Sequence, residues 1–469
     1  NHMAAAGQAQ KSVLDRLVPG YYHRLNAKGE IERSTCCDNT ATEHRMMAKL
    51  MIDSAALWVR EYRIDSMRFD LMGHQPREAM ERLQQRVNAE AGRPVQLLGE
   101  GWNFGEVANG ARFVQASQLS LNGSGIASFS DRGRDAARGG SAGEGGEDSV
   151  RRQGWLNGLV YAPNALADAK PEALLAAADM IRVGLAGSLR GFELTTWTGE
   201  KKHLDAIPYG GDQPAGFASE PGEVVNYVEN HDNQTLFDVN TLKLPLATSR
   251  EDRARVQMLG AAVVAFSQGI AYFHAGQDIL RSKSLDRNSY DSGDWFNRLD
   301  WSYQTNHFGT GLPPRQDNFG KEGRDWALAR ERLADPAIAP GPAEIVWARD
   351  VFRDLLKIRA STPLLRLPSA AEITKRVSFP GSGAGQNPVL VATRIDGAGR
   401  PGFKAVMTLI NVAPTSQTLK LPAEAGAAWR LHPVQRGAQA ADQRVAKQAK
   451  VVDGVFEVPA RSAVVFVVN

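Results

Sequence analysis

The sequence predicts an α/β protein built on part of a (β/α)8 barrel and followed by an all-β sandwich. Two observations predict this fold. Up to residue 362, short apolar runs typical of buried strands alternate with helical patterns, which indicates a parallel sheet. From residue 363 onward, short β-rich runs are separated by turns. We therefore expect a partial barrel over residues 1–362 and a β-sandwich domain over residues 363–469.

The first helix is predicted by a capping-box pattern from Thr40 to Glu43. The apolar residues after it recur with the helical period and are expected to face the core: Met47, Leu50, Met51, Leu57 and Trp58.

A strand, helix and strand follow in order. Ile64–Leu71 and Val95–Leu98 are the two strand-like runs, and Pro76 stands where the helix between them would begin. Gly92 is expected to end that helix. Its apolar residues share one face: Met80, Leu83 and Val87.

Further units of the same kind continue the pattern. Their strands and helices are expected at Gly125–Phe129, Val224–Val228, Arg253–Phe266, Ile270–His274 and Glu344–Ala360. Gly139–Gly146 and Ser282–Arg324 lack periodicity and are expected to be long loops. The strands of the sandwich are expected at Val389–Ile395, Phe403–Val412, Thr418–Leu421 and Ala463–Val468.

The bulk composition excludes some classes of function. Lys and Arg number 55 and Asp and Glu number 52, so the net charge is +3, and without a basic run we expect no nucleic-acid partner. The apolar run Leu259–Phe266 is far shorter than the roughly 20 residues that span a bilayer, so we expect a buried helix there and no membrane partner. The start of the chain lacks the pattern of a signal peptide.

The two cysteines, Cys36 and Cys37, are adjacent in the sequence. Adjacent Cα atoms lie about 3.8 Å apart, below the usual disulfide range. A strained vicinal bridge and two free thiols therefore stay open as alternatives, and the compartment does not follow from them.

Arg68 and Asp70 form the first candidate site. They are two residues apart in a strand, so they point to the same face, while Met67 and Phe69 point to the other. A guanidinium beside Asp70 favours its ionised form, which a nucleophile needs. A purely structural salt bridge is the alternative.

Glu100 ends the next strand and is expected to project beside Asp70. Two neighbouring carboxylates are the minimum that a glycosidase needs. The apolar wall of Trp102 is expected to raise the pKa of Glu100, as a general acid requires. Capping of a following helix is the alternative role for Glu100.

His231 and Asp232 directly follow the strand Val224–Val228. Asp and Asn are also common helix N-caps, so a capping role is the alternative here too. Because the three motifs fall at three strand ends of one predicted sheet, we favour catalysis over the three structural alternatives.

The motifs around these residues resemble the conserved regions of pullulanases and limit dextrinases, α-1,6-glucosidases of the α-amylase family (glycoside hydrolase family 13). The matching segments are Arg68–Gly73 (RFDLMG), Gly99–Ala108 (GEGWNFGEVA), His231–Phe237 (HDNQTLF), Phe273–Gln277 (FHAGQ), Leu280–Arg287 (LRSKSLDR) and Tyr290–Phe296 (YDSGDWF). The resemblance covers residues 1–362 and extends more loosely to the β-rich tail.

The resemblance implies a retaining hydrolysis of α-1,6-glucosidic bonds in pullulan, amylopectin, glycogen or limit dextrins. It makes Asp70 the nucleophile, Glu100 the acid and base, and Asp232 the stabiliser of the transition state. The residues expected to bind substrate are Arg68, Trp102, His231 and Arg287. A covalent intermediate requires Asp70 and Glu100 to lie about 5 to 5.5 Å apart.

The start of the chain departs from the family. Asn1 and His2 match the last two residues of a family block, Asp-Val-Val-Tyr-Asn-His, at the third barrel strand, although a cloning remnant would also explain His2-Met3. On the first interpretation only barrel strands 4 to 8 are present, and we expect the open barrel to be unstable or inactive alone.

The remaining expectations concern partners and alternatives. We expect no required cofactor, and structural calcium is the alternative to a solvated loop for segments such as Asp286–Asp294. We expect an α-glucan substrate, a monomer, and a secreted or cell-envelope location, with the cytoplasm as the alternative. The competing functions are an α-1,4-acting or transglycosylating relative and a non-catalytic glucan-binding barrel.

Overall fold

The computed structural model describes residues 2–3, 13–35, 37–141, 143–290 and 292–469. The chain forms two compact units. The first unit comprises the described part of residues 1–129 together with Phe217–Val225, and the second comprises Ser130–Gly216 with Asn226–Asn469. The chain therefore leaves the first unit and later returns to it for a single strand. The question left open for the cysteine pair falls on Cys36, which lies outside the described residues.

A parallel sheet organises the first unit. Its strands are β3 (Ser66–Phe69), β4 (Gln96–Gly99), β5 (Ala127–Phe129) and β10 (Val224–Asn226), in the spatial order β10-β5-β4-β3. Each neighbouring pair is parallel. The predicted parallel sheet is confirmed. β3, β5 and β10 are shorter than their apolar runs, whereas β4 has the predicted length and is shifted by one residue.

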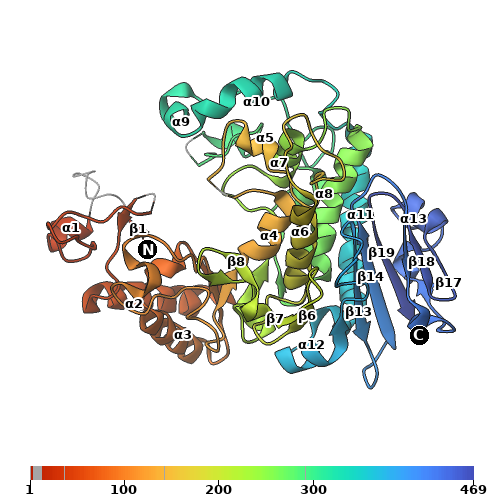
Figure 1. Cartoon of the computed structure of the whole chain (residues 1–469). Coiled ribbons are helices and arrows are strands. Elements are labelled where there is room, and N and C mark those ends of the chain that lie inside the picture. Colours follow the sequence, from red (N-terminus) through yellow and green to blue (C-terminus); the bar gives the residue numbers. More distant parts are fainter. Residues whose placement is uncertain (1, 4–12, 36, 142, 291) are drawn as a thin grey trace. The chain divides into compact units, whose positions relative to one another are not determined.

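Two helices cover this sheet (Figure 1). α2 (Arg45–Tyr62) and α3 (Arg77–Ala91) pack against each other and contribute to one core. The predicted inner face of α3 is confirmed, because Met80, Leu83 and Val87 are without exposure. α3 ends as expected at Gly92, whose φ of 65° is left-handed.

Expectations for α2 were wrong in two respects. Thr40 and Glu43 do not form its cap, because the helix begins after His44 with no side-chain capping bond. The residues facing the core are Met47, Ala48, Ile52, Ala55, Ala56 and Val59. Leu50, Leu57 and Trp58 are instead 43 to 50% exposed. Three of the core-facing residues are alanines, which a pattern based on large apolar side chains does not identify.

Smaller elements of the first unit precede and connect these layers. They are β1 (His2–Met3), α1 (Leu14–Leu17), β2 (Asp38–Asn39) and the 3-10 turns η1 (Met72–His74), η2 (Gly105–Gly110) and η4 (Pro221–Glu223). β1 and β2 pair antiparallel.

The second unit begins with helices and two small hairpins. In chain order these are α4 (Asp131–Arg138), α5 (Asp148–Arg151), α6 (Pro171–Leu185), β6 (Glu193–Thr195), β7 (Lys201–His203), η3 (Leu204–Ala206), β8 (Pro208–Gly210) and β9 (Gln213–Pro214). Residues 139–141 and 143–146 have no helix or strand, as predicted for this glycine-rich loop.

The predicted helix near Leu259–Phe266 is confirmed as α8 (Arg250–Phe266), which is buried from Arg253 onward. The helix predicted at Glu344–Ala360 is α11 (Pro342–Ser361). The region around them holds α7 (Leu236–Lys243), β11 (Ile270–Ala271), η5 (Gln277–Ile279), η6 (Asp294–Phe296), η7 (Gly323–Asp325) and α10 (Trp326–Leu333). The 282–324 segment, expected to be loop throughout, contains the helix α9 (Arg315–Glu322).

Two antiparallel sheets form the carboxyl-terminal part of the second unit (Figure 1). One has the order β12-β13-β14-β19-β16 and the other β15-β18-β17. The elements of this part are η8 (Pro363–Arg366), α12 (Ala370–Arg376), β12 (Val377–Ser378), β13 (Leu390–Asp396), β14 (Ala405–Asn411), β15 (Gln417–Lys420), η9 (Pro422–Glu424), β16 (Arg430–Leu431), η10 (Pro433–Gln435), α13 (Gln443–Gln448), β17 (Lys450–Val452), β18 (Val455–Val458) and β19 (Ser462–Val468).

The two sheets share one core. Met407 and Leu409 of β14 and Phe466 of β19 pack with Phe456 and Val458 of β18. This is the sandwich that the sequence predicts. Because α8 and α11 belong to the same compact unit as the sandwich, the domain boundary at residue 363 stays a prediction.

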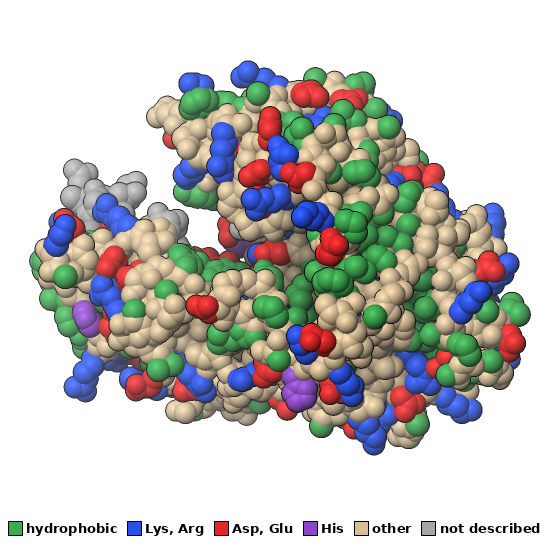
Figure 2. Space-filling model, in the orientation of Figure 1, with side chains coloured by type: hydrophobic (Ala, Val, Ile, Leu, Met, Phe, Trp, Pro, Cys, Tyr) green, Lys and Arg blue, Asp and Glu red, His purple; other side chains and the backbone are tan. Residues whose placement is uncertain are grey.

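The surface mixes charges of both signs. On the face shown in Figure 2, Lys and Arg side chains alternate with Asp and Glu side chains. Within the described residues, no helix combines the length and the hydropathy that a bilayer-spanning segment needs.

Replacing Leu83 by Ala tests the core of the first unit. Leu83 is completely buried, so the substitution should lower the free energy of unfolding by about 2 to 5 kcal/mol. Leu50→Ala is the matched control, because Leu50 is 43% exposed and should change stability by about 0.5 kcal/mol or less. Urea denaturation followed by circular dichroism measures both, and equal losses would contradict this assignment of the core.

Candidate active site

Asp70 and Glu100 leave the parallel sheet at the same level. β3 and β4 pair with Phe69 opposite Gly99, and the next residue on each strand is a carboxylate. The Glu100 amide donates to the Phe69 carbonyl at 3.2 Å, which extends the ladder by one bond. The parallel register thus places the two carboxylates side by side, as the sequence predicts.

The Arg68 guanidinium binds both carboxylates. Its Nη1 lies 2.6 Å from Oδ1 of Asp70, and its Nη2 lies 3.0 Å from Oε1 of Glu100. The other oxygen of Glu100, Oε2, accepts the Leu71 amide at 2.8 Å. Glu100 is 5% exposed and Asp70 is more open, with 37% of its side chain exposed.

Glu100 has a guanidinium and a backbone amide as polar partners. The expected effect of Trp102 on the pKa of Glu100 stays a prediction. The alternative role as a helix cap is wrong, because the following turn η2 begins after Phe104 with no side-chain cap. The separation of 5 to 5.5 Å between the carboxyl groups stays a prediction.

The chain turns sharply after β3. Leu71, the residue after Asp70, has a φ of 43°, a left-handed conformation that costs a non-glycine residue of order 1 to 3 kcal/mol. Gly73 then approaches the backbone of Trp102 so closely that a Cβ there would lie 2.2 Å from the Trp102 carbonyl oxygen. The half-buried Trp102 is held in this turn, and its role in sugar binding stays a prediction.

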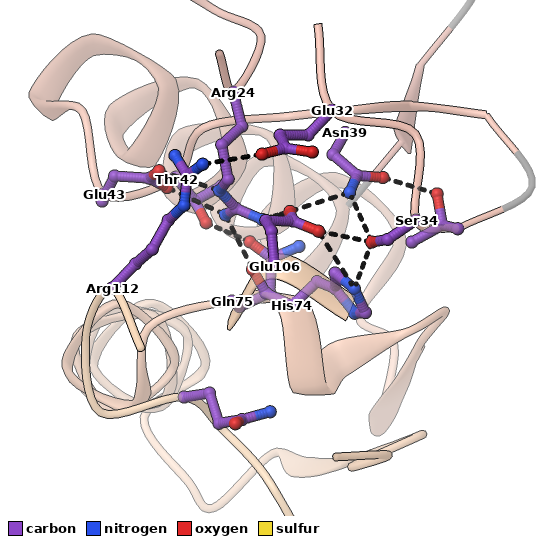
Figure 3. A network of polar contacts seen from close by, with 12 residues as sticks. Arg24, Glu32, Ser34, Asn39, Thr42, Glu43, His74, Gln75, Glu106 and Arg112 are labelled. Atoms are coloured by element: carbon purple, nitrogen blue, oxygen red, sulfur yellow. Dashed lines mark hydrogen bonds and ion pairs between the residues drawn. The ribbon is translucent and has the colours of Figure 1, made fainter. Parts of the chain in front are cut away.

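Behind this turn lies a buried arginine that the sequence analysis did not single out (Figure 3). Arg24 is 1% exposed, and its Nε and Nη2 each bind a Glu43 oxygen at 2.9 Å. Its Nη1 binds Glu106 at 2.8 Å, and its Nη2 also donates to the His74 carbonyl at 2.9 Å. His74 belongs to the turn after β3, and Glu106 belongs to the segment after β4. One guanidinium therefore joins the two segments that follow the candidate catalytic residues.

Glu106 is the second centre of this network. It accepts hydrogen bonds from Ser34, Arg24 and Asn39. Burial alone would raise the pKa of Glu106, but these three hydrogen bonds lower it to about 2. His74 Nε2 lies 3.1 Å from the Ser34 hydroxyl, which ties the turn after β3 to the same network.

In the second unit, His231 and Asp232 lie in the turn that follows β10. Both side chains are open, with 54% and 60% exposed, and His231 Nε2 lies 3.6 Å from Oδ1 of Asp232. Asn230 fixes the imidazole, since its Oδ1 lies 2.9 Å from His231 Nδ1. Asn233 has a φ of 59°, so the residue after Asp232 is left-handed, as Leu71 is after Asp70.

The helix-capping alternative for Asp232 is wrong. α7 is capped by Thr235, whose hydroxyl accepts the Asp238 amide at 3.2 Å. Asp232 and His231 are therefore presented to solvent without a capping role.

Arg287 lies against the same turn but is largely buried, with 12% of its side chain exposed. Its Nη2 lies 3.4 Å from Oδ1 of Asn233, and its Nη1 contacts the Glu144 carbonyl and lies 3.6 Å from Asp325. These contacts brace the turn, and a direct contact of Arg287 with substrate stays a prediction.

Among the residues that the structure describes, no three His, Cys, Asp or Glu side chains gather as a metal site would require. Asp286, in the segment proposed for calcium, and Glu322, at the end of α9, are buried neighbours, and burial together with the charge of Asp286 raises the pKa of Glu322 to about 7.

Comparison with known proteins identifies the family. The model for the C-terminal region of pullulanase-type α-1,6-glucosidases matches residues 303–469. Over its full length the chain is 42% identical to pullulanase 1, chloroplastic, of Arabidopsis thaliana, and 99% of it is 38% identical to a pullulanase of Klebsiella pneumoniae. The chain belongs to the pullulanase family.

Solved structures agree with this placement in the pullulanase family. The crystal structure of a maltotriose complex of PulA from Klebsiella pneumoniae matches the whole chain with a TM-score of 0.93 and 38% identity. The chain covers 50% of that structure, 50% of the Arabidopsis pullulanase and 42% of the Klebsiella pneumoniae pullulanase. It thus spans about half the length of the relatives it matches.

Replacing Arg24 by Met should destabilise the first unit. The substitution leaves Glu43 and Glu106 without their cation, and removing one partner of a buried ion pair costs about 3 kcal/mol or more. Arg112→Met is the control, because Arg112 pairs with Glu32 at a site where 32% of the arginine side chain is exposed and the pair contributes about 1 kcal/mol or less. Urea unfolding measures both, and equal losses would contradict a central role for Arg24.

Glu106 should make the fold sensitive to acid. Its pKa in the folded protein is about 2 against a usual value of 4.5, so the stabilisation is complete above pH 4.5 and is lost as pH falls toward 2. Between pH 4.5 and pH 2, the free energy of unfolding of Glu106→Gln should therefore fall less than that of the parental protein. The exposed Glu30→Gln variant serves as the control and should keep the parental acid profile.

Proposed function

We propose that the protein is a retaining glycoside hydrolase that cleaves α-1,6-glucosidic branch linkages in pullulan, amylopectin, glycogen or limit dextrins. The observation that carries the proposal is the pair Asp70 and Glu100, which end adjacent parallel strands and bind one guanidinium. Its relatives are named pullulanases, and the maltotriose complex of one of them supports an oligosaccharide substrate.

In the proposed first step, the Asp70 carboxylate attacks the anomeric carbon while protonated Glu100 donates its proton to the glycosidic oxygen. The carbon–oxygen bond of the branch breaks, and a glycosyl ester forms on Asp70. In the second step, Glu100 takes a proton from water, the water oxygen attacks the same carbon, and the ester bond breaks. Two inversions return the α-anomer.

The other residues have supporting roles in this proposal. Arg68 keeps Asp70 ionised and oriented for attack, because it binds the carboxylate at 2.6 Å. Asp232 stabilises the positive charge that develops on the sugar ring, and His231 donates a hydrogen bond to the same sugar. Trp102 and Arg287 contact neighbouring glucose units.

The finer architecture belongs to the same proposal. In this proposal β3, β4, β5, β10 and β11 correspond in chain order to strands 4 to 8 of a (β/α)8 barrel, which matches the coverage of about half of each relative. No cofactor takes part in the two steps, and calcium is proposed only as a structural ion near Asp286.

Replacing Glu100 by Gln tests the assignment. The amide cannot donate or take up the proton, so kcat on pullulan should fall by about 10² to 10⁴-fold. Asp70→Asn removes the nucleophile and should abolish turnover. Release of maltotriose is measured by chromatography, and the anomer first formed is identified by proton NMR.

Glu78→Gln is the matched control, since Glu78 is an exposed glutamate at the start of α3. It should keep parental turnover. Cleavage of amylose, transfer to another glucan, or β-anomer as the first product would each overturn the proposed activity, and glucan binding without turnover would favour a non-catalytic barrel.

A further inference from the structure

A completely buried lysine lies under the turn that carries His231 and Asp232. Lys283 has no solvent exposure. Its Nζ donates to the His231 carbonyl oxygen at 2.7 Å and to the Ser289 hydroxyl at 3.1 Å. Lysine is rarely buried without partners, because removing an ammonium ion from water is costly. Its two hydrogen bonds therefore offset part of the free-energy cost of burying the ammonium ion.

The bond to the His231 carbonyl has a particular geometric effect. This carbonyl belongs to the peptide that joins His231 to Asp232. Rotation of that peptide would change ψ of His231 and φ of Asp232, and so would redirect both side chains. An ammonium ion that holds the carbonyl oxygen fixes the peptide plane, and with it the directions in which His231 and Asp232 leave the backbone.

Lys283 is itself anchored on the far side of the turn. Its amide donates to Oδ2 of Asp238 at 2.7 Å, and the neighbouring Ser282 hydroxyl donates to Oδ1 of the same carboxylate at 2.5 Å. Asp238 is completely buried and belongs to α7, the helix that follows the turn. Hydrogen bonds therefore connect the turn, α7 and the 282–289 segment to one another. The two buried charged groups that they share are Lys283 and Asp238.

We propose that Lys283 is a positioning residue for the reaction, whose ammonium group holds the His231–Asp232 peptide in the orientation that presents both side chains to the sugar. The inference rests on the proposed function. It assigns Lys283 a role through the turn and none in contact with substrate, because the side chain is enclosed by protein.

The charge on Lys283 gives this role a pH signature. Burial lowers the pKa of Lys283 to about 8, the negative Asp286, Asp238 and Asp232 oppose this shift, and the positive Arg281 adds to it. The ammonium ion therefore loses its proton just above pH 8, and a neutral amine binds a carbonyl more weakly than a charged one. Turnover should decline along an alkaline limb near this pH.

Lys283→Met tests the role, because it removes the charge while keeping the length of the side chain. At pH 7 its kcat on pullulan should fall about ten- to a hundredfold with little change in KM, and the alkaline limb should disappear. Lys283→Arg keeps a positive charge at pH 9, so it should restore part of kcat and move the limb to higher pH.

Lys243→Met is the matched control. Lys243 is also buried, with 4% exposure, and burial lowers its pKa to about 8. Its Nζ binds the Gly139 and Arg152 carbonyls instead of the turn. This variant should lose stability but keep the parental alkaline limb. Thermal unfolding of each variant separates a loss of fold from a loss of positioning.

The outcomes distinguish this inference from the proposed function. Full turnover by Asp232→Asn would overturn the proposed function itself. If Asp232→Asn is inactive while Lys283→Met keeps the parental kcat and alkaline limb, the role of Lys283 is refuted. If Lys283→Met does not fold, an unshifted limb in Lys283→Arg or a limb that disappears in Lys243→Met refutes it.

Discussion

A guanidinium ion buried away from water must be surrounded by acceptors, and Arg24 imposes this condition on the first unit. Its acceptors are two carboxylates and a carbonyl, from Glu43, Glu106 and His74. The turn after β3 and the segment after β4 must both close around Arg24 for the charge to be compensated. The same two segments follow Asp70 and Glu100. The geometry of the candidate site thus depends on a residue that touches neither carboxylate.

In the second unit, the buried cation is a lysine. Lys283 is enclosed beneath the His231–Asp232 turn, as Arg24 is behind the turn after β3. In both places the residue after the candidate carboxylate is left-handed, Leu71 in one turn and Asn233 in the other. Such conformations persist only where the surroundings determine the backbone strongly. A buried cation with several fixed partners restricts the backbone of the turn in this way. The left-handed residue in each turn is therefore linked to the buried charge behind it.

Local patterns in the sequence predicted a large part of this fold. The parallel strands, the inner face of α3 and the sandwich strands follow from apolar period and turn residues, which depend on near neighbours. α2 was predicted less well, because its large apolar residues face outward and its alanines face the core. The capping box failed for a related reason: Glu43 satisfies Arg24, 19 residues earlier in the chain, instead of capping the helix beside it. α9 was missed because its sequence has little apolar periodicity.

The sequence alone determined which residues could perform the chemistry and that Asp70 and Glu100 would end neighbouring strands. The tertiary structure decided their surroundings. It placed Arg68 between the two carboxylates, so that one guanidinium binds both Asp70 and Glu100. It also joined Arg24 to Glu106 across 82 residues and Lys283 to His231 across 52. Strand period and motif spacing are local, whereas the partners of a buried charge are whichever acceptors the folded chain brings within hydrogen-bonding distance.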